Sequence, residues 1–145
     1  MFSTIVLGVD GSKASKKTAE YALNLAHQCG SRVLLIHVVD FSAFENIVAT
    51  PRDIAKHVYE KVMDEAQGYL DNKESICKAR DIKCDKFLKI GNPVDEIIKV
   101  AEDNDAGVIV LGSKGRSGVA GSILGSVAYG VLHRDKNIPV LVIKS

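Results

Sequence analysis

Short apolar runs alternate along this chain with longer stretches in which an apolar residue recurs every three or four positions. The periodic stretches predict four amphipathic helices. The runs predict strands buried on both faces, at Thr4–Val9, Arg32–Val39, Cys84–Ile90, Gly107–Leu111 and Pro139–Ile143. The resulting βαβαβαβαβ order is typical of a parallel α/β sheet with right-handed crossovers and helices on both faces.

Turn and capping residues set the bounds of the predicted helices. The first spans Ser15–Cys29 and stops at Gly30, the third begins at Asn92-Pro93, and the last begins near Ser122. The second begins near Arg52 after a proline. Its inward face is expected to hold Ile54, Val58, Val62, Ala66, Tyr69 or Leu70, Lys73 and Cys77. Its charged residues are expected to form a solvated face: Glu60, Lys61, Asp64, Glu65, Lys73 and Glu74.

The length, net charge and apolar runs of the chain indicate which broad class of protein it belongs to. The 145 residues carry no internal repeat and no linker, so we expect one domain over residues 1–145 with one hydrophobic core. A net charge of +1 argues against a nucleic-acid-binding surface. No apolar run approaches the roughly 20 residues that span a bilayer, and no secretory signal pattern is present at the N-terminus. These features predict a cytoplasmic protein that does not enter a membrane.

Cysteine and histidine show no catalytic or metal-binding pattern. Cys29, Cys77 and Cys84 form no CxxC pair. Buried free thiols are expected, with a disulfide between Cys77 and Cys84 as the alternative under oxidation. His37 and His133 are interpreted as hydrogen-bonded core or rim residues, because neither has a sequence partner that would make it a base. The sequence therefore predicts no catalytic residue and no resident metal.

The most informative segment lies between the fourth strand and the last helix. It contains Gly112, Gly115 and Gly125 followed by Ser126. Glycines in a strand-to-helix turn let backbone N–H groups converge on an anion, since no Cβ blocks the approach. Lys114 and Arg116 could pair with phosphates, or could be a solvated pair. The segment lacks GxxxxGK[ST] and is therefore not a classical P-loop.

Asp10 follows the first strand, and Gly112 ends the fourth. In open α/β sheets a ligand binds at the carboxyl ends of the strands, where the winding direction reverses. We expect these two residues to be neighbours if their strands are central. Asp10 can accept a hydrogen bond from a ribose hydroxyl, or can stabilise the turn Asp10–Ser12 before the first helix, and both roles can hold together.

The chain resembles the ATP-binding branch of the universal stress protein family over its whole length. The signature G-x2-G-x9-G-[ST] falls on Gly112, Gly115, Gly125 and Ser126. Further similarity covers Ile5–Ser12, Leu35–Val39, Gly91–Pro93 and Pro139–Ile143. The resemblance implies a doubly wound five-stranded parallel sheet of order 3-2-1-4-5, of the adenine-nucleotide alpha hydrolase-like class.

The resemblance also implies a nucleotide site. ATP, ADP or AMP is expected, and Mg²⁺ or Mn²⁺ could bridge the phosphates, although no dedicated carboxylate cage is present. Val9, Asp10 and Val38 would hold the ribose and adenine. The phosphates would lie on Gly112, Ser113, Lys114, Gly115, Arg116, Ser117, Gly118, Gly125, Ser126, Val127 and Ala128.

The last strand would be an edge of such a sheet. An apolar edge aggregates unless it is paired or covered. In the resembled family two such strands pair antiparallel to form a homodimer, so a homodimer through Pro139–Ile143 is implied. Alternatively, Pro139 and Lys144 could prevent this edge strand from pairing with another chain.

Three functions remain after this reasoning. The first is a regulatory ATP-binding homodimer, with Asp40–Thr50 as a closing lid. The second is a slow ATPase or phosphoryl-transfer enzyme, for which a positioned base beside Asp10 is lacking. The third is a nucleotide-free dimeric interaction module. A phospho-receiver domain is excluded, because the paired acids after the first strand are missing and Gly91 follows the third.

Overall fold

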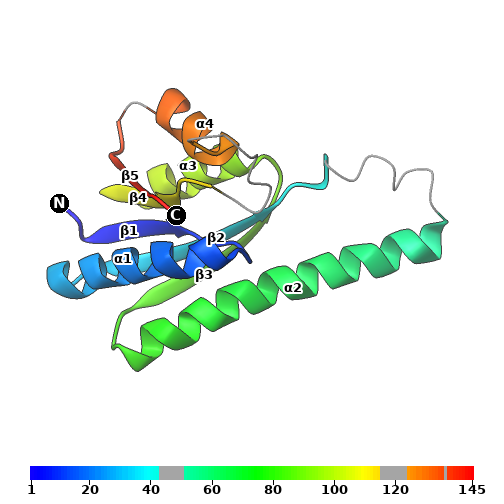
Figure 1. The fold of residues 1–145 in the computed structure, drawn as a ribbon, viewed down its shortest axis with the longest axis horizontal. Helices are drawn as coiled ribbons and strands as arrows, with labels where there is room; N and C mark the ends of the chain where they lie inside the picture. Colours follow the sequence, from blue (N-terminus) through cyan, green and yellow to red (C-terminus); the bar gives the residue numbers. More distant parts are fainter. Residues whose placement is uncertain (43–50, 115–123, 136) are drawn as a thin grey trace.

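The computed structural model describes residues 1–42, 51–114, 124–135 and 137–145 (Figure 1). Strands and helices alternate strictly along these residues. Their order is β1 (Thr4–Gly8), α1 (Lys13–Cys29), β2 (Arg32–Val39), α2 (Arg52–Ala79), β3 (Cys84–Ile90), α3 (Pro93–Asp103), β4 (Val108–Gly112), α4 (Ser126–Arg134) and β5 (Val140–Ile143). Among the described helices, none is long and apolar enough to cross a membrane.

The described strands form one parallel sheet in the order β3-β2-β1-β4-β5, which confirms the predicted fold. β1 lies between β2 and β4, with Ile5 opposite Val33 on one side and Val108 on the other. The chain winds outward in one direction through β2 and β3 and in the other through β4 and β5. The carboxyl ends of β1 and β4 are therefore adjacent, where the winding reverses.

Two apolar layers hold the sheet between its helices, because alternate residues of a buried strand point to opposite faces. Ile5 and Leu7 of β1 pack in a cluster with α1 and α2, while Val6 packs in a cluster with α3 and α4. Figure 1 shows these two helix pairs on opposite sides of the sheet.

Local capping explains where two of the helices begin. The Ser12 hydroxyl accepts a hydrogen bond from the Ser15 amide at 3.2 Å, and α1 ends at Gly30, which has a φ of 65°. The Asn92 side chain caps α3 by accepting from the Asp95 amide at 3.1 Å, and Pro93 occupies the first turn. The capping roles predicted for Gly30 and Asn92-Pro93 are confirmed.

The last helix begins later than its apolar pattern predicts. Leu124 and Gly125 are not helical, and Gly125 is the N-cap with an extended backbone of φ −70° and ψ 161°. Ser122 and Ile123 lie outside the described residues. The prediction failed at Leu124 because apolar spacing carries no information about the low helix propensity of Gly125, which follows it. Ser126, Val127 and Ala128 consequently form the first turn of α4.

The inward face predicted for α2 is correct only for its C-terminal half. Ala66, Leu70, Lys73 and Cys77 are buried, whereas Ile54 is 54% exposed. The helix has 28 residues, about 42 Å, and the seven residues of β3 beneath it extend about 23 Å. Its N-terminal half therefore extends beyond the sheet (Figure 1).

All three cysteines are free thiols, but only one is fully buried. Cys77 is buried, Cys84 is half-buried and Cys29, the last residue of α1, is exposed. The expectation of burial is therefore wrong for Cys29. Burial raises the pKa of the Cys77 thiol to about 12, which disfavours the thiolate needed for disulfide exchange.

Candidate functional site

A cavity of about 650 Å³ opens at the carboxyl edge of the sheet. Its walls come from the ends of β1, β2 and β4, the start of α4 and the middle of α2. The residues predicted from the sequence that line it are Val9, Asp10, Val38, Gly112, Lys114, Gly125, Ser126, Val127 and Ala128. Segments more than 100 residues apart in the chain, around Asp10 and Ser126, thus meet at one cavity.

Ser113, also predicted to bind the phosphates, is buried between Gly112 and Lys114 and does not line the cavity. Its amide donates to the Ile143 carbonyl at 2.8 Å, and its hydroxyl accepts from the Ser145 amide at 3.3 Å. Its carbonyl accepts a hydrogen bond from the Gly125 amide, which joins the two described ends of the glycine-rich segment. The predicted residues between those ends, Gly115, Arg116, Ser117 and Gly118, lie outside the described residues.

Backbone donors are exposed at the start of α4. The first four N–H groups of a helix have no partner within it, and Gly125 supplies no side chain to cap them. The first intrahelical acceptor, the Gly125 carbonyl, bonds the Tyr129 amide at 3.0 Å. The amides of Ser126, Val127 and Ala128 have no recorded hydrogen-bond acceptor among the described residues, and they lie at the positive end of the helix dipole.

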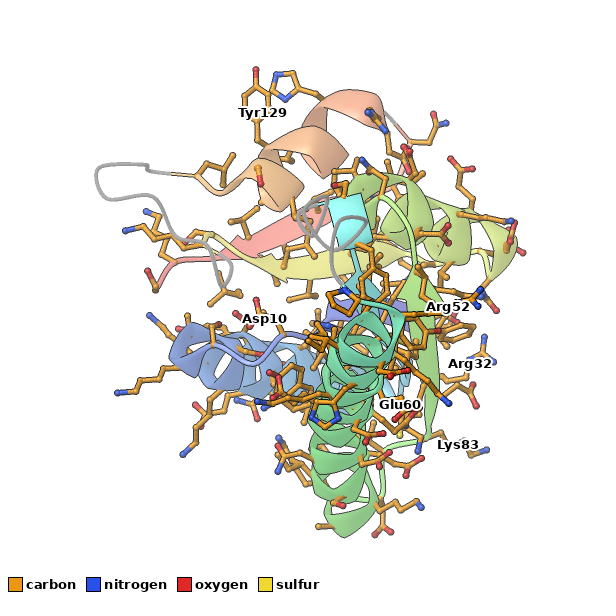
Figure 2. All side chains as sticks on the ribbon, turned by 90° about the vertical axis from the view of Figure 1, so that its right-hand side faces the viewer. Asp10, Arg32, Arg52, Glu60, Lys83 and Tyr129 are labelled. Carbon is orange, nitrogen blue, oxygen red and sulfur yellow. The ribbon has the colours of Figure 1, made fainter. Side chains whose placement is uncertain are left out.

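Asp10 lies where the chain passes from β1 into α1 (Figure 2). Its Oδ1 atom accepts hydrogen bonds from the Ser12 amide at 2.8 Å and from the Ser12 hydroxyl at 2.6 Å. The turn-stabilising role predicted for Asp10 is therefore confirmed. The residue also lines the cavity, so the turn does not remove it from reach of a ligand.

His37 anchors the end of β1. Its Nδ1 atom lies 2.7 Å from the Val9 carbonyl oxygen, and its ring meets Tyr69 edge-on at 5.4 Å. A neutral imidazole that donates from Nδ1 carries no proton on Nε2. His37 is 9% exposed, which matches the hydrogen-bonded rim residue that the sequence predicted. His133 bonds the Tyr129 carbonyl at 2.9 Å and is hydrogen-bonded as predicted.

The wall formed by α2 was not found from the sequence. Val62, Glu65 and Tyr69 line the cavity, although the periodic pattern placed Val62 and Tyr69 only on an inward face. Nothing in the local sequence shows which strand ends a helix will overhang. The available signal was the length of the periodic stretch, which exceeds what one strand can cover.

Lys73 was predicted both on the inward face of α2 and among its solvated charged residues. It is 8% exposed, so the inward placement is correct and the solvated one is wrong. Its removal from water lowers the pKa of its ammonium below 10.5, and Lys16 lowers it further, while Asp10 and Glu20 raise it. The solvated placement was wrong because it rested on the charge alone, and lysines are seldom fully buried.

The lowered pKa of Lys73 predicts a pH dependence of stability. Because the pKa of Lys73 is lower in the folded protein than in the unfolded chain, the charged ammonium destabilises the fold at every pH below its folded pKa. This destabilisation disappears as the pH rises toward 10.5, where the side chain loses its proton in the unfolded chain as well. The free energy of unfolding of the wild type should therefore rise relative to Lys73→Met as the pH approaches 10.5. Urea unfolding of both proteins between pH 7 and the alkaline limit measures this. A constant difference would contradict it.

Gly11 lets α1 and α2 approach closely. A Cβ built on Gly11 would lie 2.6 Å from the Tyr69 hydroxyl oxygen, so Gly11→Ala must displace the Tyr69 ring from the cavity wall. We expect a loss of about 1–2 kcal/mol of stability in urea unfolding. Gly68→Ala on α2 is the matched control. Its Cβ meets nothing within 4 Å, so it should gain about 0.5–1 kcal/mol.

Among the described residues, no group of three or more His, Cys, Asp or Glu side chains could hold a metal ion. The charged side chains that line the cavity are those of Asp10, Asp40, Glu65 and Lys114.

Comparison with known proteins places this architecture in a family. Residues 1–144 match the model of the universal stress protein family. The chain belongs to that family. Universal stress protein MJ0531 of Methanocaldococcus jannaschii is 32% identical to it over 144 residues, which is 99% of this chain and 83% of that protein.

Solved structures extend the similarity. MJ0577 of Methanocaldococcus jannaschii has a TM-score of 0.84 and 26% identity, covering all of this chain and 97% of that one. A universal stress protein from Archaeoglobus fulgidus, solved in complex with dAMP, has a TM-score of 0.70 and 25% identity, over 99% of this chain and 98% of that one. At these coverages, this universal stress protein shares the whole fold with both neighbours.

Proposed function

We propose that this universal stress protein binds ATP in the cavity at the carboxyl edge of its sheet and acts as a nucleotide-dependent regulatory homodimer. The observation that carries the proposal is the meeting of Asp10 and Val38 with both described ends of the glycine-rich segment. A volume of about 650 Å³ lies within the roughly 300–1,000 Å³ of small-molecule sites. The 145 residues would act as one nucleotide-binding domain.

The cavity is lined by groups of different chemistry. Asp10 is a hydrogen-bond acceptor suited to a ribose hydroxyl, and the apolar wall with the backbone of Val38 suits an adenine ring. Lys114 and the amides of Ser126–Ala128 suit phosphates. Gly115, Arg116, Ser117 and Gly118 would complete the phosphate side. This polarity favours a nucleotide over an uncharged ligand.

A solved neighbour supports the same ligand class. The Archaeoglobus fulgidus protein, at 25% identity over 99% of this chain, was solved with dAMP. Mg²⁺ or Mn²⁺ would enter with the nucleotide. Because the described cavity contains no ligand cage, the phosphates and water would supply most of the ion's ligands.

The dimer would form through β5, an edge of the sheet. The strand is short and apolar, and Leu141 is 38% exposed. Antiparallel pairing with a second copy would satisfy the outward backbone groups of the edge. The regulatory role follows if nucleotide occupancy alters the strength of this pairing.

The direct test is to denature freshly purified protein, identify released small molecules by mass spectrometry, and titrate the same batch with ATP and Mg²⁺ in a calorimeter. We expect adenine nucleotide at about one per chain, or a Kd of order micromolar. Absence of both would refute the nucleotide function and leave a nucleotide-free interaction module on this fold.

A further inference from the structure

The middle of α2 presents a narrow stripe of three residues to the proposed nucleotide cavity. Val62, Glu65 and Tyr69 all line this cavity. Their spacing of three and four residues places them on one face of the helix. Glu65 therefore brings a carboxylate to the cavity between an aliphatic and an aromatic side chain. The contacts proposed above for the nucleotide leave this carboxylate without a role.

Tyr69 fixes the position of this stripe along the sheet. Its ring meets the His37 ring of β2 edge-on at 5.4 Å. Because α2 connects the parallel strands β2 and β3, it runs antiparallel to them, and its residues before Tyr69 lie farther toward the carboxyl edge. Glu65 is four residues before Tyr69, about 6 Å along the helix axis. It thus lies near the level of Val38 and Val39, where the adenine ring is proposed to lie.

Glu65 differs from the other two carboxylates of the cavity in its hydrogen bonds. The Asp10 Oδ1 atom accepts from the amide and hydroxyl of Ser12, and the Asp40 Oδ1 atom accepts in the same way from Ser42, at 2.9 and 2.6 Å. Glu65 is exposed, and no hydrogen bond or ion pair of its side chain is recorded with any described residue. Its carboxylate can therefore accept a hydrogen bond from a ligand without breaking one within the protein.

Glu65 and the start of α4 reach the cavity from opposite faces of the sheet. The apolar cluster that includes Leu70 of α2 lies on one face, and the cluster that includes Ala128 of α4 lies on the other. A ligand in the cavity would therefore meet an acceptor, Glu65, from one side and the backbone donors of α4 from the other. A nucleotide whose phosphates bind the α4 amides would direct its base toward α2.

We propose that Glu65 is a specificity-determining residue of the nucleotide site: its carboxylate accepts a hydrogen bond from the exocyclic amino group of the base. The inference rests on the proposed nucleotide function and deepens it. A carboxylate accepts hydrogen bonds but does not donate them. Adenine carries an amino donor at position 6, where guanine and hypoxanthine carry a carbonyl oxygen. Glu65 would therefore favour a 6-aminopurine nucleotide over a 6-oxopurine nucleotide.

The test compares ATP with inosine triphosphate (ITP) by titration calorimetry in Mg²⁺. The two nucleotides carry the same phosphates and the same charge, so the ratio of their affinities cancels the phosphate contacts and the net charge of the cavity. The wild type should bind ATP about 10-fold more tightly than ITP. Glu65→Gln keeps the length of the side chain and adds a donor, so its amide can pair with either base. The ratio should then fall to about 2 or less.

Asp64→Asn is the matched control. It removes one negative charge from the neighbouring position of α2, which is exposed and does not line the cavity. Both affinities should rise by the same factor, because less negative charge opposes the phosphates, and the wild-type ratio should persist. A merely electrostatic or structural role of Glu65 would likewise leave the ratio unchanged.

The outcomes separate this inference from the proposed function. ATP binding with equal affinity for ITP in the wild type, or a ratio that Glu65→Gln leaves unchanged, would overturn the role of Glu65 and leave the nucleotide function intact. A ratio that falls in Asp40→Asn but not in Glu65→Gln would assign the amino group to the end of β2 and overturn it as well. If neither nucleotide bound, the proposed function would itself be refuted, and the role of Glu65 with it.

Discussion

Replacing Ser126 by proline is expected to weaken ATP binding by about 10- to 100-fold while the fold stays intact. Ser126 is the first residue of α4, and its amide is one of the donors available at the cavity. A hydrogen bond to a charged phosphate contributes about 1.5–3 kcal/mol, which corresponds to this loss. Titration calorimetry with ATP and Mg²⁺ measures the change.

The backbone at this position already suits proline. Proline is favoured at the first position of a helix, where its missing N–H has no helical partner. The residue before a proline must be extended, and Gly125 has φ −70° and ψ 161°. The Tm should therefore change by no more than about 3 °C.

Ser126→Ala is the matched control, because it removes the hydroxyl and keeps the amide. It should lose only several-fold in affinity. If Ser126→Pro bound ATP as tightly as the wild type, the start of α4 would not contact the phosphates. If both variants lost the same affinity, the hydroxyl rather than the backbone would be the important donor.

Replacing Val142 by proline is expected to convert the protein from a dimer to a monomer. The carbonyls of Pro139 and Ile143 accept hydrogen bonds from Ile109 and Ser113 of the neighbouring segment. Backbone groups alternate in direction along a strand, so Val140 and Val142 present theirs away from β4. Proline at Val142 removes an outward donor that antiparallel pairing with a second copy would use.

Sedimentation velocity distinguishes the outcomes. Wild type and Val142→Thr, which keeps both the N–H and the branched side chain, should sediment at twice the 15.6 kDa of one chain. Val142→Pro should sediment as a monomer at concentrations of order 10 μM and should keep its Tm within a few degrees. A Val142→Pro dimer would exclude β5 as the interface.

Adding ATP to the wild type tests the regulatory part of the proposal. A dimer whose dissociation constant changes with ATP links the two sites, because any ligand that prefers one assembly state shifts the equilibrium toward it. An unchanged dissociation constant would leave ATP binding and pairing as independent properties.

The strands and the sheet class could be predicted from the sequence alone. β2 and β3 have the predicted bounds, β1 and β5 differ by one residue at one end, and β4 is shifted by one residue at both ends. A strand buried on both faces needs a continuous run of apolar residues, and such a run can be recognised within the strand's own sequence. The cap of α3 was equally local, since Asn92 bonds the amide three residues away. The start of α1 was predicted at Ser15, two residues too late, because Ser12 caps the helix and Lys13 is its first residue.

The resemblance to a family supplied the strand order and the candidate site residues that carry no chemical signal of their own, such as Val9, Val38, Val127 and Ala128. Helix ends that lack a capping side chain were harder to predict from the sequence. α4 begins at Ser126 because Gly125 is extended and bonded to Ser113, a contact between residues twelve apart that apolar spacing does not encode.

Only the tertiary structure determined which residues share a cavity. The sequence by itself determined the alternation of strands and helices and the local turn at Asp10, because these depend on burial patterns and hydrogen bonds within a few residues. The overhang of α2, the burial of Lys73 and the contact of Tyr69 with Gly11 depend on where a 28-residue helix crosses a shorter sheet. That placement is set by the packing of whole layers, and no single segment of the sequence contains it.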